Sequence, residues 1–312
     1  PLLVAHFGRP KGKVNLEMSL RQVLPALRRA LMRTVALVET LDAAEHMTAE
    51  VAAADVVLIE NIRFHAGEEV NDPAFAARLA KIGDVFCNDA FSAAHRAHAS
   101  TEGLAHHLPS CAGRLMQAEL SALEAALSKP ERPVGAVVGG AKVSTKIALL
   151  ENLVNRLDLL VIGGGMANTF LAAAGFPVGK SLVEEEMIAT ARMLMAETDI
   201  PLPVDVMVAK EFSEQAAATL KGVEDVADDD MILDIGPETS KRFGEIIAGM
   251  KTILWNGPIG VFEFEAFSRG TEVVSRAIAA NAGFSIAGGG ETITAIDKFG
   301  ISSDISYIST GG

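Results

Sequence analysis

Cysteine and positive charge are both scarce in this 312-residue chain. The only cysteines, Cys87 and Cys111, lack the spacing of metal ligands, which argues against a disulfide scaffold and favours a reducing, cytoplasmic location. Lys and Arg number 27 against 40 Asp and Glu, so the formal net charge is -13. Such a surface repels nucleic acid and anionic membranes, and we expect neither as a partner. An anionic ligand must therefore be small and held by a local cluster of cations.

Targeting and membrane segments are also missing from the sequence. The chain opens at Pro1 without a charged leader or a small-residue cleavage site, so no signal peptide is expected. The longest weakly polar stretch, residues 159–179, is interrupted by glycines and by Asn168 and Thr169. This pattern favours a buried strand followed by a helix over a membrane span.

Short apolar runs alternate with helix-like stretches along the whole chain. The runs cover residues 2–5, 35–38, 56–59, 85–87, 134–138, 159–162, 204–208, 252–255, 284–287 and 306–308. This alternation is typical of parallel sheets covered by helices. Residues 115–127 have apolar residues at helical spacing, and Pro130 and Pro133 then end that helix. We therefore expect two doubly wound, Rossmann-like α/β domains, residues 1–128 and 129–312, joined by a hinge helix over about 115–127. The acidic stretch 223–230 is expected to be a solvated surface turn.

Glycine-rich turns follow five strands of the second part. They are Gly139-Gly140, Gly163-Gly164-Gly165, Asn256-Gly257-Pro258, Gly288-Gly289-Gly290 and Gly311-Gly312. The carboxyl ends of parallel strands share one edge, and glycine lets backbone amides approach a phosphate there, so these turns indicate an anion-binding edge. The alternative is that the glycines only make tight turns and close helix packing. Neither the P-loop motif nor Gly-x-Gly-x-x-Gly occurs.

Two lysines follow the first of these turns. If Ser144 caps a helix that begins at Thr145, Lys146 lies in its first turn, where the helix dipole disfavours a cation by roughly 0.3–1 kcal/mol. We expect Lys142 and Lys146 to reach phosphates at this helix start, with two solvated surface lysines as the alternative. Near the later turns, Glu263 is expected to accept ribose hydroxyls, and Glu291 to hold a phosphate-bound Mg²⁺.

Histidine and arginine gather after the strands of the first part. All seven histidines lie before Gly113, and most sit beside an arginine: His6 with Arg9, Arg63 with His65, and Arg96 between His95 and His98. The guanidinium group of arginine can donate two parallel hydrogen bonds to a phosphate or a carboxylate. If these strand ends converge on one edge, their arginines would form a pocket for a small polyanion. A metal site at His95 and His98 is the competing interpretation, but the neighbouring arginines would repel a dication. For any single histidine a structural role fits equally well.

The chemistry that suits these two edges is phosphoryl transfer. No Gly-x-Ser-x-Gly, His-Glu-x-x-His or reactive-cysteine signature occurs, and the second part contains no histidine, so covalent catalysis is not indicated. Phosphoryl transfer needs positioning and charge stabilisation, which lysines, arginines, helix N-termini and Mg²⁺ supply. A carboxylate acceptor is already ionised and needs no base. Placing the two substrates on separate domains would require a hinge closure that excludes water.

Six sequence blocks closely resemble phosphoglycerate kinases, in order and nearly end to end. They are residues 6–12 (His-Phe-Gly-Arg-Pro-Lys-Gly), 60–65 (Glu-Asn-Ile-Arg-Phe-His), 88–91 with 95–98, 139–146 (Gly-Gly-Ala-Lys-Val-Ser-Thr-Lys), 255–258 (Trp-Asn-Gly-Pro) and 309–312 (Ser-Thr-Gly-Gly). The resemblance implies a monomer that closes around a hinge and transfers a phosphoryl group reversibly between ATP and 3-phosphoglycerate, giving ADP and 1,3-bisphosphoglycerate in glycolysis.

The resemblance also implies roles for individual residues. Phosphoglycerate would be bound by His6, Arg9, Arg63 and Arg96. Nucleotide and its Mg²⁺ would be bound by Lys142, Lys146, Gly140, Gly164, Gly165, Asn256, Glu263, Gly289, Gly290, Glu291 and Thr292, with Glu291 as the metal ligand. Catalysis would involve Lys142, Arg9, Gly311 and Gly312.

The sequence departs from the family pattern in five places. The sequence lacks the family's opening strand, with its Asp and Asn, and the helix that follows Gly312. We expect that residues are missing at these two places. The loops before Pro201 and around Ala282 are shortened, and Glu291 replaces the usual Asp. These departures keep a non-catalytic nucleotide-binding relative as an alternative. A dinucleotide dehydrogenase is a further alternative, but it would need the fingerprint that is absent.

Overall fold

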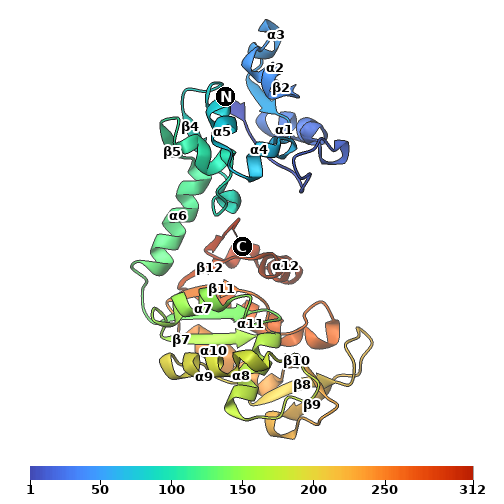
Figure 1. The fold of residues 1–312 in the computed structure, drawn as a ribbon. Helices are drawn as coiled ribbons and strands as arrows, with labels where there is room; N and C mark the ends of the chain where they lie inside the picture. Colours follow the sequence, from blue (N-terminus) through green and yellow to red (C-terminus); the bar gives the residue numbers. More distant parts are fainter. Residues whose placement is uncertain (312) are drawn as a thin grey trace. The chain divides into compact units, whose positions relative to one another are not determined.

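The structure, a computed structural model, describes residues 1–311. Two compact units follow one another along the chain: Pro1–Ala118, and the residues from Glu119 onward. Helix α6 (Arg114–Leu127) runs across this division (Figure 1) and corresponds to the helix expected at 115–127. The assignment of one substrate to each of two domains, with a boundary at residue 128, stays a prediction.

The first unit contains two parallel sheets. Strands β1 (Leu2–Leu3), β3 (Val56–Ile59) and β2 (Val35–Val38) form one sheet in that order, and β4 (Phe86–Asn88) pairs with β5 (Ser110–Ala112) in the other. Val57 and Ile59 pack against one group of buried residues and Val56 and Leu58 against another, so side chains fill both faces of the first sheet. The helices of this unit are α1 (Leu24–Leu31), α2 (Leu41–Glu45), α3 (Ala49–Ala52), α4 (Ala66–Glu69) and α5 (Pro73–Ala80).

The second unit is built on a five-stranded parallel sheet. Its order is β13-β12-β11-β6-β7, with β6 (Val134–Gly139), β7 (Leu159–Gly163), β11 (Thr252–Asn256), β12 (Phe284–Ala287) and β13 (Tyr307–Ile308). β7 and β11 flank β6 on opposite sides, which makes the end of β6 a topological switch point, where ligands bind in open α/β sheets.

Helices cover both faces of this sheet. Alternate residues of a strand point to opposite faces, so Val138 packs with α7 (Ile147–Val154), α8 (Gly165–Ala174) and α9 (Ile188–Glu197), while Val137 packs on the other side. The helices of that other side are α10 (Pro237–Ala248), α11 (Arg269–Ala280) and α12 (Gly290–Phe299). The doubly wound arrangement expected from the sequence is confirmed. Within residues 1–311, no helix combines the length and apolar character needed to cross a bilayer.

The run 204–208, expected to be a strand of a parallel sheet, lies instead in a three-stranded antiparallel sheet that the sequence did not predict. β8 (Asp205–Ala209) lies between β10 (Met231–Ile235) and β9 (Thr219–Gly222). The expectation that residues 223–230 form a solvated turn is wrong at Asp230. That carboxylate is buried, and the ammonium groups of Lys221 and Lys210 lie 2.6 and 2.8 Å from it. Two cations compensate the charge, which is why the protein buries it.

Candidate functional site

Lys146 connects two strand ends at the carboxyl edge of the main sheet. Its Nζ donates to the backbone carbonyls of Gly139, at 2.7 Å, and Asn256, at 2.9 Å, and also contacts Asn256 Oδ1. The Asn256 amide donates onward to the Gly288 carbonyl at 3.0 Å, and Thr292 Oγ1 accepts from Gly257 N at 2.7 Å. The ends of β6, β11 and β12 and the start of α12 thus form one hydrogen-bonded network.

The glycine turns at this edge pack backbone against backbone. A Cβ atom added to Gly139 would lie 1.8 Å from the Pro258 carbonyl oxygen. Gly164 has a φ of +67°, and a Cβ there would lie 2.6 Å from the carbonyl oxygen of Gly140. At Gly290, by contrast, nothing lies within 4 Å of the added atom. Close packing therefore explains Gly139 and Gly164, whereas Gly290 stands in open space at the start of α12.

The predicted cap of α7 is wrong. The helix begins at Ile147 with Lys146 as its N-cap residue. Ser144 instead donates its backbone N–H, at 3.0 Å, and its hydroxyl to the buried carboxylate of Glu184. Burial alone would raise the pKa of Glu184, but these hydrogen bonds hold it below its usual value. Glu184 takes both Ser144 donors, and the two residues that follow, Thr145 and Lys146, stay outside the helix.

The electrostatic setting of Lys146 also differs from the expectation. Its ammonium group is already held by carbonyl oxygens, so a bound anion is not needed to offset the helix dipole. Burial lowers the pKa of Lys146, and the nearby Glu291 carboxylate opposes that shift. Lys142 is exposed beside Ala141, which lines the adjoining pocket.

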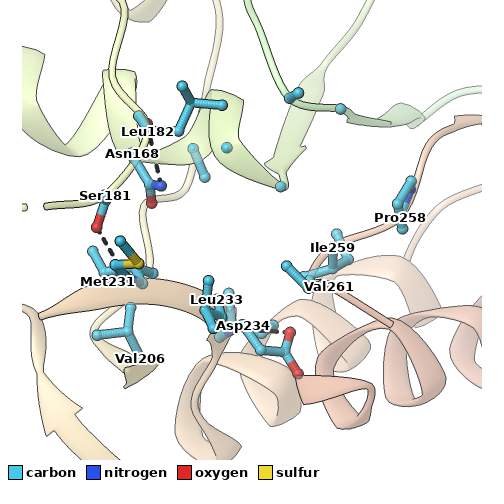
Figure 2. Close-up of a pocket in the computed structure, with 18 of the residues that line it drawn as sticks. Asn168, Ser181, Leu182, Val206, Met231, Leu233, Asp234, Pro258, Ile259 and Val261 are labelled. Atoms are coloured by element: carbon cyan, nitrogen blue, oxygen red, sulfur yellow. Dashed lines mark hydrogen bonds between the residues drawn. The ribbon is translucent and has the colours of Figure 1, made fainter. Parts of the chain in front are cut away.

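A pocket of about 490 Å³ opens beside these turns (Figure 2). Among the residues predicted from the sequence, Gly140, Gly164, Gly165, Glu263 and Glu291 line it. The structure therefore gathers these five residues around one cavity. Lys146, Asn256, Gly289, Gly290 and Thr292 lie at the same strand edge through the network described above, although they do not line the cavity.

Much of the pocket wall was not predicted. Apolar side chains from α8, β8 and β10 and from the loop after β8 supply it: Leu171, Val206, Met231, Leu233 and Phe212. Four polar residues that were not predicted also line the cavity: Asn168, Lys180, Ser181 and Asp234. Three of them, Asn168, Ser181 and Asp234, are labelled in Figure 2. The signal for Asn168 was present in the sequence as a polar interruption of an apolar stretch.

Asp234 stabilises the turn that carries part of this wall. The carboxylate is 3% exposed and accepts hydrogen bonds from Gly270 N at 2.7 Å and Ile235 N at 2.9 Å. Burial raises the pKa of Asp234 to about 7, against the lowering effect of these two bonds. Thr271, next to Gly270, accepts from Gly260 N at 3.0 Å. Asp234 thus ties the start of α11 to β10.

In the first unit the predicted cationic residues come together. Burial lowers the pKa of His6, and the charges of Arg63, Arg96 and His98 lower it further. Arg63 follows β3 in a 3-10 helix (Ile62–Phe64), is 4% exposed and donates from Nη1 to the Gly8 carbonyl at 2.9 Å.

The buried Arg63 guanidinium is only partly paired. Its Nε lies 3.5 Å from Glu69 Oε1, too far for a good hydrogen bond, and has no hydrogen-bond partner in residues 1–311. Burial lowers the pKa of Arg63, Glu69 opposes this, and the charges of Arg96 and Arg9 lower it further. Four of the predicted substrate ligands therefore share one electrostatic cluster in this unit.

Two further histidines, His65 and His98, pack against neighbouring side chains. The His65 ring packs on Phe75 with centroids 5.1 Å apart, and burial lowers its pKa. His98 Nδ1 lies 3.8 Å from Glu68 Oε1. In the part of the chain that the structure describes, no three His, Cys, Asp or Glu side chains gather as a metal site would require.

The segment after β13 is anchored to α6. Buried Glu119 accepts hydrogen bonds from Thr310 N at 2.7 Å and Ser309 Oγ at 2.8 Å, and Gly311 N donates to Ser309 Oγ at 3.0 Å. Gly311 is therefore held at the same sheet edge as the other turns. Gly312, also predicted to be catalytic, lies outside the described residues.

Comparison with known proteins places the chain in one family. A family model described as phosphoglycerate kinase matches residues 1–312. The phosphoglycerate kinase of Roseobacter denitrificans is 56% identical over 324 residues, covering 100% of this chain and 82% of that protein, and that of Rhodospirillum centenum is 53% identical over 322 residues, covering 100% and 81%. The solved structure of phosphoglycerate kinase from Coxiella burnetii has a TM-score of 0.91 and 44% identity over 100% of this chain and 81% of that one. The chain therefore belongs to the phosphoglycerate kinase family, and it is a phosphotransferase acting reversibly between ATP and 3-phosphoglycerate.

Proposed function

We propose that the nucleotide of this reaction binds in the pocket of the second unit and that 3-phosphoglycerate binds to the cationic cluster of the first. The observation that carries the nucleotide assignment is the shared edge of five parallel strands, where glycine turns border a 490 Å³ cavity at the switch point of the sheet.

The two ends of the nucleotide site differ in chemistry. Lys146, Asn256, Gly289, Gly290 and Thr292 lie where phosphates would meet the N-terminus of α12, which favours anions. Gly140, Gly164 and Gly165 would border the base, whose faces suit the apolar wall. Glu263 is exposed at the pocket and would accept the ribose hydroxyls.

Glu291 fits a Mg²⁺ ion bound together with the phosphates. It lies in the first turn of α12, lines the pocket, and its charge acts on Lys146. Mg²⁺ in nucleotide sites takes one or two carboxylates and completes its coordination with phosphate oxygens and water. The longer side chain of Glu still offers such a carboxylate. When bound, the ion would neutralise charge on the β- and γ-phosphates.

The first unit offers ligands for a small polyanion. His6, Arg9, Arg63 and Arg96 would bind 3-phosphoglycerate, with guanidinium forks matched to its carboxylate and phosphate. The free Nε–H of Arg63 supports this assignment, because a buried donor without a partner is costly.

For catalysis, Lys142 would stabilise the phosphoryl group in transfer, helped by Arg9 and by the backbone at Gly311 and Gly312. The acceptor carboxylate is ionised and needs no base. With one substrate on each unit, transfer requires a hinge-bending closure that excludes water. We further propose that the enzyme acts as a cytoplasmic monomer.

A coupled assay tests the activity on the intact protein. ATP, Mg²⁺ and 3-phosphoglycerate together should give turnover, and omission of Mg²⁺ should abolish it. The pocket assignment has its own test: Met231→Trp fills the cavity from β10 and should raise KM for ATP at least about tenfold while leaving KM for 3-phosphoglycerate near that of the wild type. Unchanged KM for ATP in this variant would show that the nucleotide binds elsewhere.

A further inference from the structure

Asn168 carries an unpaired acceptor beside the pocket. The residue lies in α8, is 2% exposed, and lines the cavity. Its Nδ2 donates weakly to the Leu182 carbonyl at 3.4 Å, whereas Oδ1 is buried and has no hydrogen-bond partner among residues 1–311. Figure 2 shows the amide with its nitrogen toward Leu182 and its oxygen turned away. A buried acceptor of this kind is unfavourable unless something else supplies a donor.

Its position within the pocket suggests where that donor comes from. α8 begins at Gly165, and Asn168 lies three residues further, about one turn along the helix. The wall around it includes the apolar side chains of Leu171, Val206 and Met231, and also Ser181, whose hydroxyl accepts a hydrogen bond from Ile232 N at 2.8 Å. A planar base bordered by Gly164 and Gly165 would therefore have one edge near the Asn168 amide. A small number of polar groups fixes orientation and specificity in ligand sites.

The Leu182 carbonyl sets the orientation of the amide. Rotating the side-chain amide by half a turn would bring Oδ1 against the Leu182 carbonyl oxygen and leave two acceptors facing each other. The stable orientation keeps Nδ2 on Leu182, so the atom left without a partner beside the pocket is the acceptor Oδ1 and not the donor Nδ2.

We propose that Asn168 is a specificity-determining residue that reads the purine base: Oδ1 accepts a hydrogen bond from the exocyclic 6-amino group of adenine. A 6-oxo purine places an oxygen at that position and would meet Oδ1 with no proton between them. This inference rests on the proposed binding of the nucleotide in this pocket. The competing explanation is a water molecule that satisfies Oδ1 and makes no contact with the base.

The test compares ATP with inosine triphosphate, whose base carries an oxygen at position 6 and a proton on N1. The ratio of kcat/KM for the two nucleotides is measured in the intact enzyme, in Asn168→Leu, and in Asn152→Leu. Asn152 is an exposed helical asparagine outside the pocket, so Asn152→Leu is the matched control. Asn168→Leu removes both polar atoms and keeps the number and branching of the side-chain heavy atoms. Should it fail to fold, as judged by thermal unfolding, Asn168→Ala replaces it.

The wild type and Asn152→Leu should prefer ATP by about tenfold, the value of one well-placed neutral hydrogen bond, and Asn168→Leu should lower this preference to about twofold or less. The loss should appear mainly in KM for ATP. Equal use of the two nucleotides by the wild type, or an undiminished preference in Asn168→Leu, overturns the inference.

The Met231→Trp variant separates this failure from failure of the pocket itself. If Met231→Trp weakens nucleotide binding while Asn168→Leu keeps the preference for ATP over inosine triphosphate, the nucleotide binds in the pocket and only the proposed contact between Asn168 and the base is wrong. If Met231→Trp leaves KM for both nucleotides unchanged, the nucleotide does not bind in this pocket, and the inference about Asn168 is wrong as well.

Discussion

Glu119 and Thr310 are joined by a hydrogen bond across 191 residues of sequence, from the Thr310 backbone N–H to Glu119 Oε1 at 2.7 Å. The carboxylate is fully buried, and the hydroxyls of Ser309 and Thr310 also donate to it. A carboxylate has about four acceptor sites, and three donors from residues 309 and 310 occupy most of them. That segment leads directly into Gly311, so α6 sets the position of a turn that we assign to catalysis.

Replacing Glu119 should therefore loosen the segment after β13. Glu119→Ala leaves the buried Ser309 hydroxyl and the donors of the more exposed Thr310 without their acceptor, and we expect a loss of about 2–3 kcal/mol in the free energy of unfolding, measured with urea. The value of kcat should also fall, because Gly311 loses its anchor. Glu124→Ala, on an exposed position of the same helix, is the control and should change stability by less than about 0.5 kcal/mol. Similar stability in the two variants would contradict this prediction.

The two lysines after β6 should have different kinetic effects. Lys142 is exposed and makes its proposed contribution only in the transition state, so Lys142→Ala should lower kcat by about 10²–10³-fold and change KM for ATP by less than about threefold. Lys146 connects Gly139 and Asn256 beside the proposed phosphate site, so Lys146→Ala should raise KM for ATP by at least about tenfold. Steady-state kinetics with ATP as the varied substrate distinguishes the two. Identical profiles would refute the division of roles.

Arg63 offers a test of the substrate assignment. Arg63→Ala removes a guanidinium from the cationic cluster of the first unit, and KM for 3-phosphoglycerate should rise by about tenfold or more while KM for ATP stays within about twofold. The matched control is Arg78→Ala in α5 of the same unit, where the guanidinium pairs with Glu45 at 2.8 Å. That variant should leave both KM values unchanged. If Arg63→Ala weakens both substrates equally, the assignment of one substrate to each unit is wrong.

The sequence predicted the strand edge well because its signals are local. Runs such as 134–138 and 159–162 are apolar throughout, as expected for parallel strands buried on both faces, and each ends directly in glycine. Because the strands pair in parallel, the glycine turns at their carboxyl ends must lie at the same edge of the sheet. Gly140, Gly164 and Gly165 were found in this way.

Features that depend on distant partners were missed. The cap of α7 failed because Glu184, 40 residues away, takes the donors of Ser144. The sheet of β8, β9 and β10 was missed because β9 is a half-exposed strand with the sequence Thr-Leu-Lys-Gly, which has little apolar pattern. Asn168 was recognised as polar but not as a pocket residue, since only the packing of α8 against β10 determines what it faces.

Asp234 should make stability depend on pH. Its pKa rises from 3.8 in the unfolded chain to about 7 in the fold, so the folded state binds a proton more tightly than the unfolded state does. For a raised pKa, the stabilising contribution is complete below the unfolded value and is lost as pH rises through the folded value. Between pH 4 and pH 8 the wild type should therefore lose as much as about 4 kcal/mol relative to Asp234→Asn, which cannot ionise.

Urea unfolding at pH 5 and pH 8 measures this difference directly, because all other titrating groups are common to the two proteins and cancel. Asp228→Asn, at an exposed position, is the control, and its stability relative to the wild type should be nearly the same at both pH values. A difference between wild type and Asp234→Asn that stays constant, or that grows in favour of the wild type as pH rises, would mean that Asp234 is ionised in the fold. In that case the N–H groups of Gly270 and Ile235 compensate the buried charge, and the carboxylate, rather than the acid, holds the start of α11 against β10.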